Sequence, residues 1–225
     1  MEDLSYLSRE THKNGGLFIV SVDPIALGMF SPPGDYDADI VTGECQPLGI
    51  PLSFGGPYAG LLACKKEYLR QMPGRIVGST TDQQNRKGYV LMLQTREQHI
   101  RRERATSNIC TSESLMSLTA AIYLATLGRR GLRQIAEACY HKSHYAASLI
   151  GKIPGYSLPL SSTFFQEFVV QCPKPPKEIN HQLLKSGILG GLDISSVISD
   201  SMLFCVTEMN TSEEIHKLVK ALKSI

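Results

Sequence analysis

The middle of the chain holds a run of arginines that could bind an anion. Its members are Arg96, Arg101, Arg102 and Arg104. Guanidinium groups pair with carboxylates through two parallel hydrogen bonds, so the run could present a basic surface to an acidic partner. It equally fits a solvated helix, because Glu97 and Arg101 form an i,i+4 pair in the favourable order. The polar stretch 106–108 that follows is prone to local hydrogen bonding.

Three other groups of residues could do chemistry, but each has a simpler structural interpretation. The Gly-Gly-Pro segment 55–57 could approach a phosphate, yet it lacks the helix-opening spacing of a phosphate loop, which favours a turn. His141 and His144 could bind a metal, but no third ligand is in view, so a solvated helix face is favoured and no metal site is predicted. The six cysteines lie 19 or more residues apart, which excludes C-x-x-C zinc or redox spacing and favours reduced, apolar cysteines.

The first half of the chain alternates between expected strands and turn-rich loops. A short amphipathic helix over 2–14 precedes the apolar run 17–23, which is typical of a strand covered on both faces, as in a parallel sheet. Further strands are expected over 38–41 and 58–64. Open α/β sheets build their sites at strand ends, so the loops there are the expected place for function. Residues 115–127 are apolar all round and predict a buried helix.

The second half predicts a smaller α/β unit after a stop at Gly128. The expected elements are a helix over 132–150, a strand over 164–172, a helix after Pro175-Pro176, a strand over 202–207, and a final helix that opens with the capping box Thr211–Glu214. We therefore expect two domains, 1–128 and 129–225.

Composition indicates an ordinary globular protein. Of 225 residues, 42% are hydrophobic, and the formal net charge is only +2. That charge is too small to indicate nucleic acid or an anionic membrane as a partner. No apolar run approaches the roughly 18 residues that span a bilayer, and the acidic start does not resemble a signal peptide. A cytoplasmic location is expected.

Three motifs carry a resemblance to a known family. They are Val22–Gly28 (VDPIALG), Gly49–Tyr58 (GIPLSFGGPY) and Leu93–Thr111 (LQTREQHIRRERATSNICT). They resemble the P-protein of the glycine cleavage system, and within it the first of two subunits. The resemblance covers essentially all 225 residues and implies the carboxy-terminal half of a longer subunit. It also implies the fold of pyridoxal phosphate (PLP)-dependent transferases, the aspartate aminotransferase-like fold type I, as a partial large α/β domain and a small carboxy-terminal α/β domain.

The resemblance implies a lost cofactor site in this chain. Enzymes of this fold hold PLP through a lysine and keep its pyridine nitrogen protonated with an acid. By similarity, Gln46 or Pro47 stands at the place of the lysine, and no lysine occurs between Lys13 and Lys65. Asp23 falls at the place of the acid, where a relic with a structural role at a strand end is favoured over a working ligand.

The function implied is that of a helper subunit with no catalytic residue of its own. PLP would be bound by the second, catalytic subunit, which decarboxylates glycine and passes the aminomethyl group to the lipoyl arm of the H-protein. The expected contacts with the partner's site are Arg96, His99, Arg101, Arg102, Thr106, Ser107 and Asn108. A second hypothesis is a truncated assembly module that binds a partner without restoring activity. An independent aminotransferase or desulfurase is disfavoured by the missing lysine.

Overall fold

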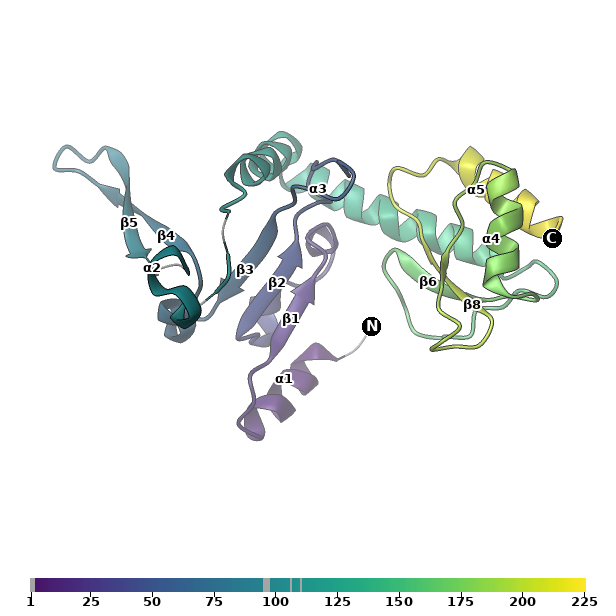
Figure 1. Ribbon diagram of the computed structural model, residues 1–225, viewed down its shortest axis with the longest axis horizontal. Coiled ribbons are helices and arrows are strands. Elements are labelled where there is room, and N and C mark those ends of the chain that lie inside the picture. The colour runs from purple at the N-terminus through teal and green to yellow at the C-terminus, as the bar shows by residue number, and fades with distance from the viewer. Residues whose placement is uncertain (1–2, 95–97, 106, 110) are drawn as a thin grey trace. The chain divides into compact units, whose positions relative to one another are not determined.

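The computed structural model describes residues 3–94, 98–105, 107–109 and 111–225 (Figure 1). These residues form two compact units. One unit comprises Leu4–Pro24 and Ser31–Thr126, and the other comprises Asp3, Ile25–Phe30 and Leu127–Ile225. We call them the N-terminal unit and the C-terminal unit.

The N-terminal unit is built on a three-stranded sheet of order β1-β2-β3. Strands β1 (Ile19–Val22) and β2 (Ile40–Glu44) are parallel, whereas β3 (Gly60–Cys64) runs antiparallel to β2. The expected strands are present, but the sheet is mixed and not parallel throughout. The expected cover on both faces is not found among the described residues, because Ile19 in β1 is exposed.

Helices and turns connect and flank this sheet. The predicted first helix is α1 (Leu4–Lys13). Short 3-10 helices flank two strands: η2 (Pro33–Tyr36) precedes β2, and η3 (Lys66–Gln71) follows β3. Because η2 ends at Asp37 in a left-handed conformation, the chain turns sharply into β2.

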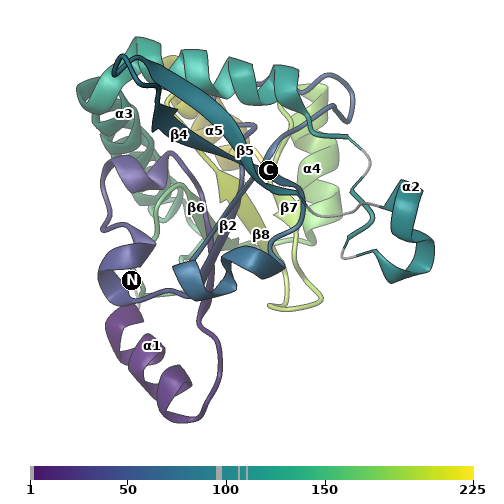
Figure 2. The same ribbon diagram turned by 90° about the vertical axis from the view of Figure 1, so that its left-hand side faces the viewer.

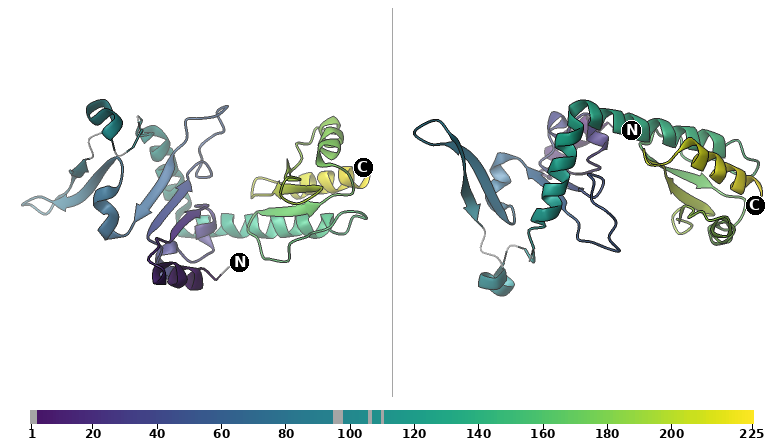
Figure 3. Two further views of the ribbon diagram at one scale, coloured as in Figure 1. Left: turned by 60° about the horizontal axis from the view of Figure 1, so that its bottom comes forward. Right: turned by 90° about the horizontal axis from the view of Figure 1, so that it is seen from above.

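A hairpin that the sequence analysis did not anticipate follows η3. Its strands are β4 (Arg75–Thr81) and β5 (Lys87–Gln94), which pair antiparallel with an irregularity between Ile76 and Val77. Figure 3 shows the hairpin projecting from the rest of the N-terminal unit. The predicted basic helix is short: α2 spans Gln98–Arg101, and the 3-10 turn η4 (Arg102–Arg104) follows it directly.

The long helix α3 (Ser114–Ile150) is broken at Gly128, where φ is 60° and ψ is −176°. The predicted stop is therefore confirmed, and the two helical arms fall in different units. The first arm was expected to be buried all round. Only one of its faces is buried among the described residues, since Leu115, Leu118 and Ile122 on another face are exposed.

The C-terminal unit packs three helices against a small antiparallel sheet. The sheet has the order β6-β8-β7, with β6 at Glu167–Gln171, β7 at Leu192–Asp193 and β8 at Ser201–Cys205. The expected helices are α4 (Pro176–Lys185) and α5 (Ser212–Lys223), and α5 begins with the predicted capping box. The core joins Ala146, Ile150, Phe168, Val170, Ile179, Leu183, Met202, Phe204, Ile215 and Leu222.

The turn η1 (Ala26–Gly28) belongs to the C-terminal unit although it precedes β2 in the sequence. Gly28 lies so close to the second arm of α3 that a Cβ atom would stand 2.7 Å from the carbonyl oxygen of Leu132. Only glycine permits this approach, which gives the motif 22–28 a packing role.

Candidate functional site: the carboxyl edge of β1 and β2

The carboxyl ends of β1 and β2 lie side by side at one edge of the sheet. The two strands are parallel, and Val22 pairs in register with Gly43. Asp23 directly follows β1, and Gln46 stands two residues beyond the end of β2. The structure thus brings the two predicted site residues to the same edge, which is where open α/β sheets build their sites.

The loop after β2 is anchored by its backbone. The amide of Cys45 donates to the carbonyl of Ala59 at 2.8 Å, and the amide of Ile50 donates to the carbonyl of Gln46 at 3.1 Å. Cys45, Leu48 and Ile50 are buried, so the loop is held by apolar packing as well as by hydrogen bonds. These contacts fix the place of Gln46.

Gln46 is half-buried and Pro47 is exposed. The Nε2 atom of Gln46 is buried and has no hydrogen-bond partner among the described residues. A buried amide donor without an acceptor costs free energy, so such a group calls for a partner or a functional reason. In the Gln46 side chain, the lone pair of Nε2 is delocalised into the amide carbonyl. This amide can therefore donate a hydrogen bond but cannot form an imine.

Gly49 packs the loop against the first arm of α3. Its φ is +80°, a conformation that L side chains rarely adopt, and a Cβ atom there would lie 2.8 Å from Cδ2 of Tyr123. Helix α3 therefore approaches the candidate edge through the face of Tyr123, and any side chain at residue 49 would displace that ring.

The Gly-Gly-Pro segment forms a turn, as predicted. The backbone is left-handed from Ser53 to Gly56, and the amide of Gly55 donates to the carbonyl of Leu52 at 3.1 Å. The hydroxyl of Tyr58 donates to the same carbonyl at 3.0 Å and closes the loop. Phe54 at its tip is fully exposed.

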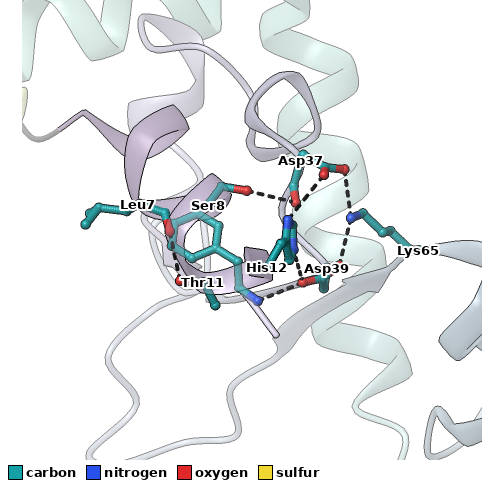
Figure 4. A network of polar contacts seen from close by, with 8 residues as sticks. Leu7, Ser8, Thr11, His12, Asp37, Asp39 and Lys65 are labelled. Atoms are coloured by element: carbon teal, nitrogen blue, oxygen red, sulfur yellow. Dashed lines mark hydrogen bonds and ion pairs between the residues drawn. The ribbon is translucent and has the colours of Figure 1, made fainter. Parts of the chain in front are cut away.

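The opposite edge of the sheet carries an ion-pair cluster that the sequence analysis missed. Asp39, which immediately precedes β2, is only 3% exposed. It accepts hydrogen bonds of 2.7 Å each from Nζ of Lys65, Nε2 of His12 and the amide of Phe18. Lys65 also lies 2.7 Å from Oδ1 of Asp37, so it bridges two carboxylates, as Figure 4 shows.

The cluster perturbs the acid–base equilibria of its members. Burial alone would raise the pKa of Asp39, but the hydrogen bonds from Lys65, His12 and Phe18 outweigh it and hold that pKa well below its ordinary value. The hydrogen bonds to Asp37 and Asp39 raise the pKa of Lys65. The cluster therefore holds α1, β1, β2 and the end of β3 together as a structural node.

The node fixes Lys65 far from the candidate edge. Lys65 follows β3, whose last residue, Cys64, pairs with Ile40 at the amino end of β2. The five residues of β2 separate the two edges by roughly 16 Å. Lys65 consequently lies at the end of the sheet opposite to Asp23 and Gln46.

The described part of the predicted basic segment comprises α2, η4 and residues 107–108. His99, Arg101, Arg102, Arg104 and Asn108 are exposed, and Ser107 is half-buried. No ion pair of the part of the chain that the structure describes involves Arg101, Arg102 or Arg104. Ser107 accepts a local hydrogen bond of 3.5 Å from the amide of Ile109. Arg96 and Thr106 fall outside the described residues.

The described part of the basic segment does not meet the candidate edge. Figures 1 and 2, which view the molecule from directions 90° apart, both place α2 to one side of the sheet β1-β2-β3. The exposed guanidinium groups are therefore free to meet an anionic group on another molecule.

The remaining predicted positions are structural. His144 was expected on a solvated face, but its ring stacks on Phe164 with a centroid distance of 4.0 Å, and its Nε2 lies 3.0 Å from the carbonyl of Phe164. Over the described ranges, no three His, Cys, Asp or Glu side chains gather as a metal site would require, and none of the five cysteines in these ranges forms a disulfide. Within those same ranges, no helix has the length and apolar character needed to cross a bilayer.

Known proteins resemble this chain along its whole length. The family model "Glycine cleavage system P-protein" matches residues 1–222. A "Probable glycine dehydrogenase (decarboxylating) subunit 1" of Thermomicrobium roseum is 52% identical over 99% of this chain, and its counterpart in Desulforamulus reducens is 52% identical over 100%. The chain spans about half the length of these relatives, 50% and 51% respectively.

Solved structures agree on the fold. The crystal structure of a glycine decarboxylase (P-protein) of the glycine cleavage system, in inhibitor-bound form, superposes with a TM-score of 0.91 at 40% identity, covering 100% of this chain and 52% of that one. A cysteine desulfurase of Escherichia coli shares the fold with a TM-score of 0.66 at 16% identity, covering 99% of this chain and 54% of that one. The predicted fold, that of type I PLP-dependent transferases, is confirmed. The chain belongs to the glycine cleavage system P-protein family.

Proposed function

We propose that this chain is a PLP-free part of glycine dehydrogenase (decarboxylating) and supports a PLP site on a second, catalytic subunit. In that complex, glycine is decarboxylated and its aminomethyl group is passed to the lipoyl arm of the H-protein in the cytoplasm. The chain's own part is to bind the catalytic subunit and to place polar and cationic side chains at the entrance of its site.

One observation carries the proposal. At the edge where this fold attaches PLP, the chain offers the carboxamide of Gln46 and the ring of Pro47, and its nearest lysine in sequence, Lys65, is bound by Asp37 and Asp39 at the opposite edge. The residues present therefore do not fit covalent attachment of PLP. Asp23 remains at the edge as a half-buried acid, and we interpret it as a relic that now caps β1.

Two features support a role at a partner's site. Arg101, Arg102 and Arg104 are exposed cations with no described ion pair, and such guanidinium groups suit carboxylates or phosphates. The buried Nε2 of Gln46 has no described acceptor, and an acceptor from another polypeptide would satisfy it. Among the described residues, the arginines have no ion-pair partner and Nε2 of Gln46 has no hydrogen-bond acceptor.

A second candidate function is a non-catalytic assembly module. It is favoured by the exposed guanidinium groups of α2 and η4, which suit binding to another molecule and require no chemistry in this chain. Such a module would bind the catalytic subunit without restoring activity.

Co-expression with the catalytic subunit tests both candidates. We expect the chain alone to show no bound PLP and no exchange of the glycine carboxyl group with CO₂, and we expect exchange to appear when both chains are present. Exchange by the catalytic subunit alone at the same rate as with this chain would contradict the supporting role. Binding without any gain in exchange would leave the assembly module as the function.

A further inference from the structure

The hairpin β4–β5 exposes large apolar side chains on both of its faces. Residues directly opposite one another in an antiparallel pair share a face, so Val77 lies with Leu91 on one face, and Tyr89 points to that same side. Val90 and Met92 belong to the other face. The exposed fractions are 60% for Val77, 69% for Tyr89, 47% for Val90, 52% for Leu91 and 61% for Met92.

This apolar region is confined to the base of the hairpin. The tip, residues 79–87, carries serine, threonines and charged side chains, and its turn is closed by an ion pair of 2.7 Å between Arg86 and Asp82. The tip is polar and two of its charged side chains pair with each other, whereas the base is apolar. This difference indicates that another surface covers the base and not the tip. We call residues 76–78 and 89–93 the hairpin base.

The described residues do not provide that cover. A two-stranded hairpin alone is marginally stable in water, and its open edges are free to pair with another chain. Monomeric proteins rarely leave contiguous apolar patches of this kind exposed. Figure 3 shows the hairpin reaching away from the sheet β1-β2-β3 in both views.

We propose that the hairpin base is a docking surface for the catalytic partner subunit. This inference rests on the proposed function and specifies the surface through which it acts. The choice of occupant follows from continuity: β5 ends at Gln94, and α2 begins at Gln98 with the exposed arginines that we assign to the partner's site. Only three residues separate the two elements, so the hairpin base is adjacent in sequence to the arginines of the proposed interface.

The chemistry of the complementary surface follows as well. It presents apolar side chains opposite Leu91 and Val77 and carries acidic groups or a bound anion where it meets Arg101 and Arg102. An apolar centre with charges at its rim is the usual composition of a specific protein interface. Apolar burial at the hairpin base then supplies affinity, and the arginines supply orientation.

The test compares Leu91→Glu with Thr80→Glu in the co-expressed complex. Both changes add one carboxylate at an exposed position of the same hairpin, but Leu91 lies in the base and Thr80 near the polar tip. We expect Leu91→Glu to weaken association with the catalytic subunit by at least about tenfold, since a charge buried in an apolar contact has no partner there. Thr80→Glu should bind like the unmodified chain. Val77→Thr, which keeps the branched shape of valine, should weaken association several-fold.

Thermal unfolding and sedimentation of the isolated chain complete the test. Because these side chains are already exposed, we expect the unfolding midpoint and the oligomeric state of the isolated variants to match those of the unmodified chain. Equal association of Leu91→Glu and Thr80→Glu would overturn the inference while leaving the proposed function intact. Loss of self-association alone would identify a second copy as the occupant and would also overturn it. If the unmodified chain does not bind the catalytic subunit, the proposed function and the inference both fail.

Discussion

Nζ of Lys65 lies 2.7 Å from Oδ1 of Asp39, a carboxylate that is only 3% exposed, at the amino end of β2. Gln46 stands beyond the other end of the same strand. The ammonium group of Lys65 thus holds the sheet together at one edge, and the carboxamide of Gln46 lies at the other edge. The structural role of the cluster follows from these contacts, and the proposed helper role of the chain rests on this separation.

The first prediction concerns the ion-pair cluster. Lys65→Met should remove the ammonium group that pairs with the buried carboxylate of Asp39. We expect the midpoint of thermal unfolding to fall by roughly 5 °C, because a buried carboxylate that loses its partner is destabilising. Lys66→Met is the matched control, since Lys66 is exposed and takes part in no described ion pair. Equal midpoints for the two variants, measured by circular dichroism, would show that Lys65 does not stabilise the sheet.

The second prediction is a pH dependence of stability. The pKa of Asp39 is lower in the folded chain than its ordinary value, so folding favours the ionised form. The stabilisation is fully present above the unfolded pKa of about 4 and is lost as pH falls toward the folded pKa. Urea unfolding between about pH 6 and pH 3 should therefore show a decline in the free energy of unfolding that is shallower in Asp39→Asn. The same slope in both proteins would contradict the assignment.

The third prediction tests the packing that places the loop after β2. Gly49→Ala should reduce the free energy of unfolding by about 2 kcal/mol, because the new methyl group meets the ring of Tyr123 and the backbone conformation is unfavourable for alanine. Gly60→Ala serves as the control, since its nearest neighbour atom would be 3.8 Å away and its φ is not in the left-handed region. A smaller effect at residue 49 than at residue 60 would contradict this view of the loop.

The fourth prediction concerns the basic segment. The double substitution Arg101→Ala with Arg102→Ala should lower glycine–CO₂ exchange of the co-expressed complex by about tenfold or more, which corresponds to about 1.4 kcal/mol in the barrier. The stability of the isolated chain should not change, because both side chains are exposed. Arg129→Ala with Arg130→Ala removes the same charge from exposed positions outside the segment. An equal loss of exchange in the two double variants would indicate an unspecific charge effect.

Two structural features that depend on residues close together in the sequence were predicted correctly. The capping box of α5 forms between Thr211 and Glu214, three residues apart, and the stop at Gly128 depends on one residue's backbone, so both could be predicted. The meeting of Asp23 and Gln46 at one edge was also accessible, because parallel strands place their carboxyl ends together.

Two kinds of feature could not be predicted from the sequence: contacts between residues far apart in the chain, and apolar faces that no described residue covers. In the ion-pair cluster, His12 and Lys65 lie 27 and 26 residues from Asp39, so no spacing signals the contact. The sequence did not predict the hairpin, because the residues from Tyr89 to Leu93 are all large and apolar. They therefore lack the alternation of apolar and polar residues that is typical of a strand with one solvent-exposed face. The apolar first arm of α3 indicated burial, yet the described residues cover only one of its faces.

The most direct test of the central claim is reduction of the isolated chain with borohydride in the presence of PLP, followed by peptide mass spectrometry. In our proposal, a carboxamide at residue 46 and a lysine bound by two carboxylates at the far edge leave no amine at the candidate edge for the cofactor. We expect no PLP absorbance to remain with the chain after gel filtration and no specific PLP adduct on any of its lysines. A stoichiometric adduct on one lysine of this chain would show that it carries the cofactor itself and would contradict the account.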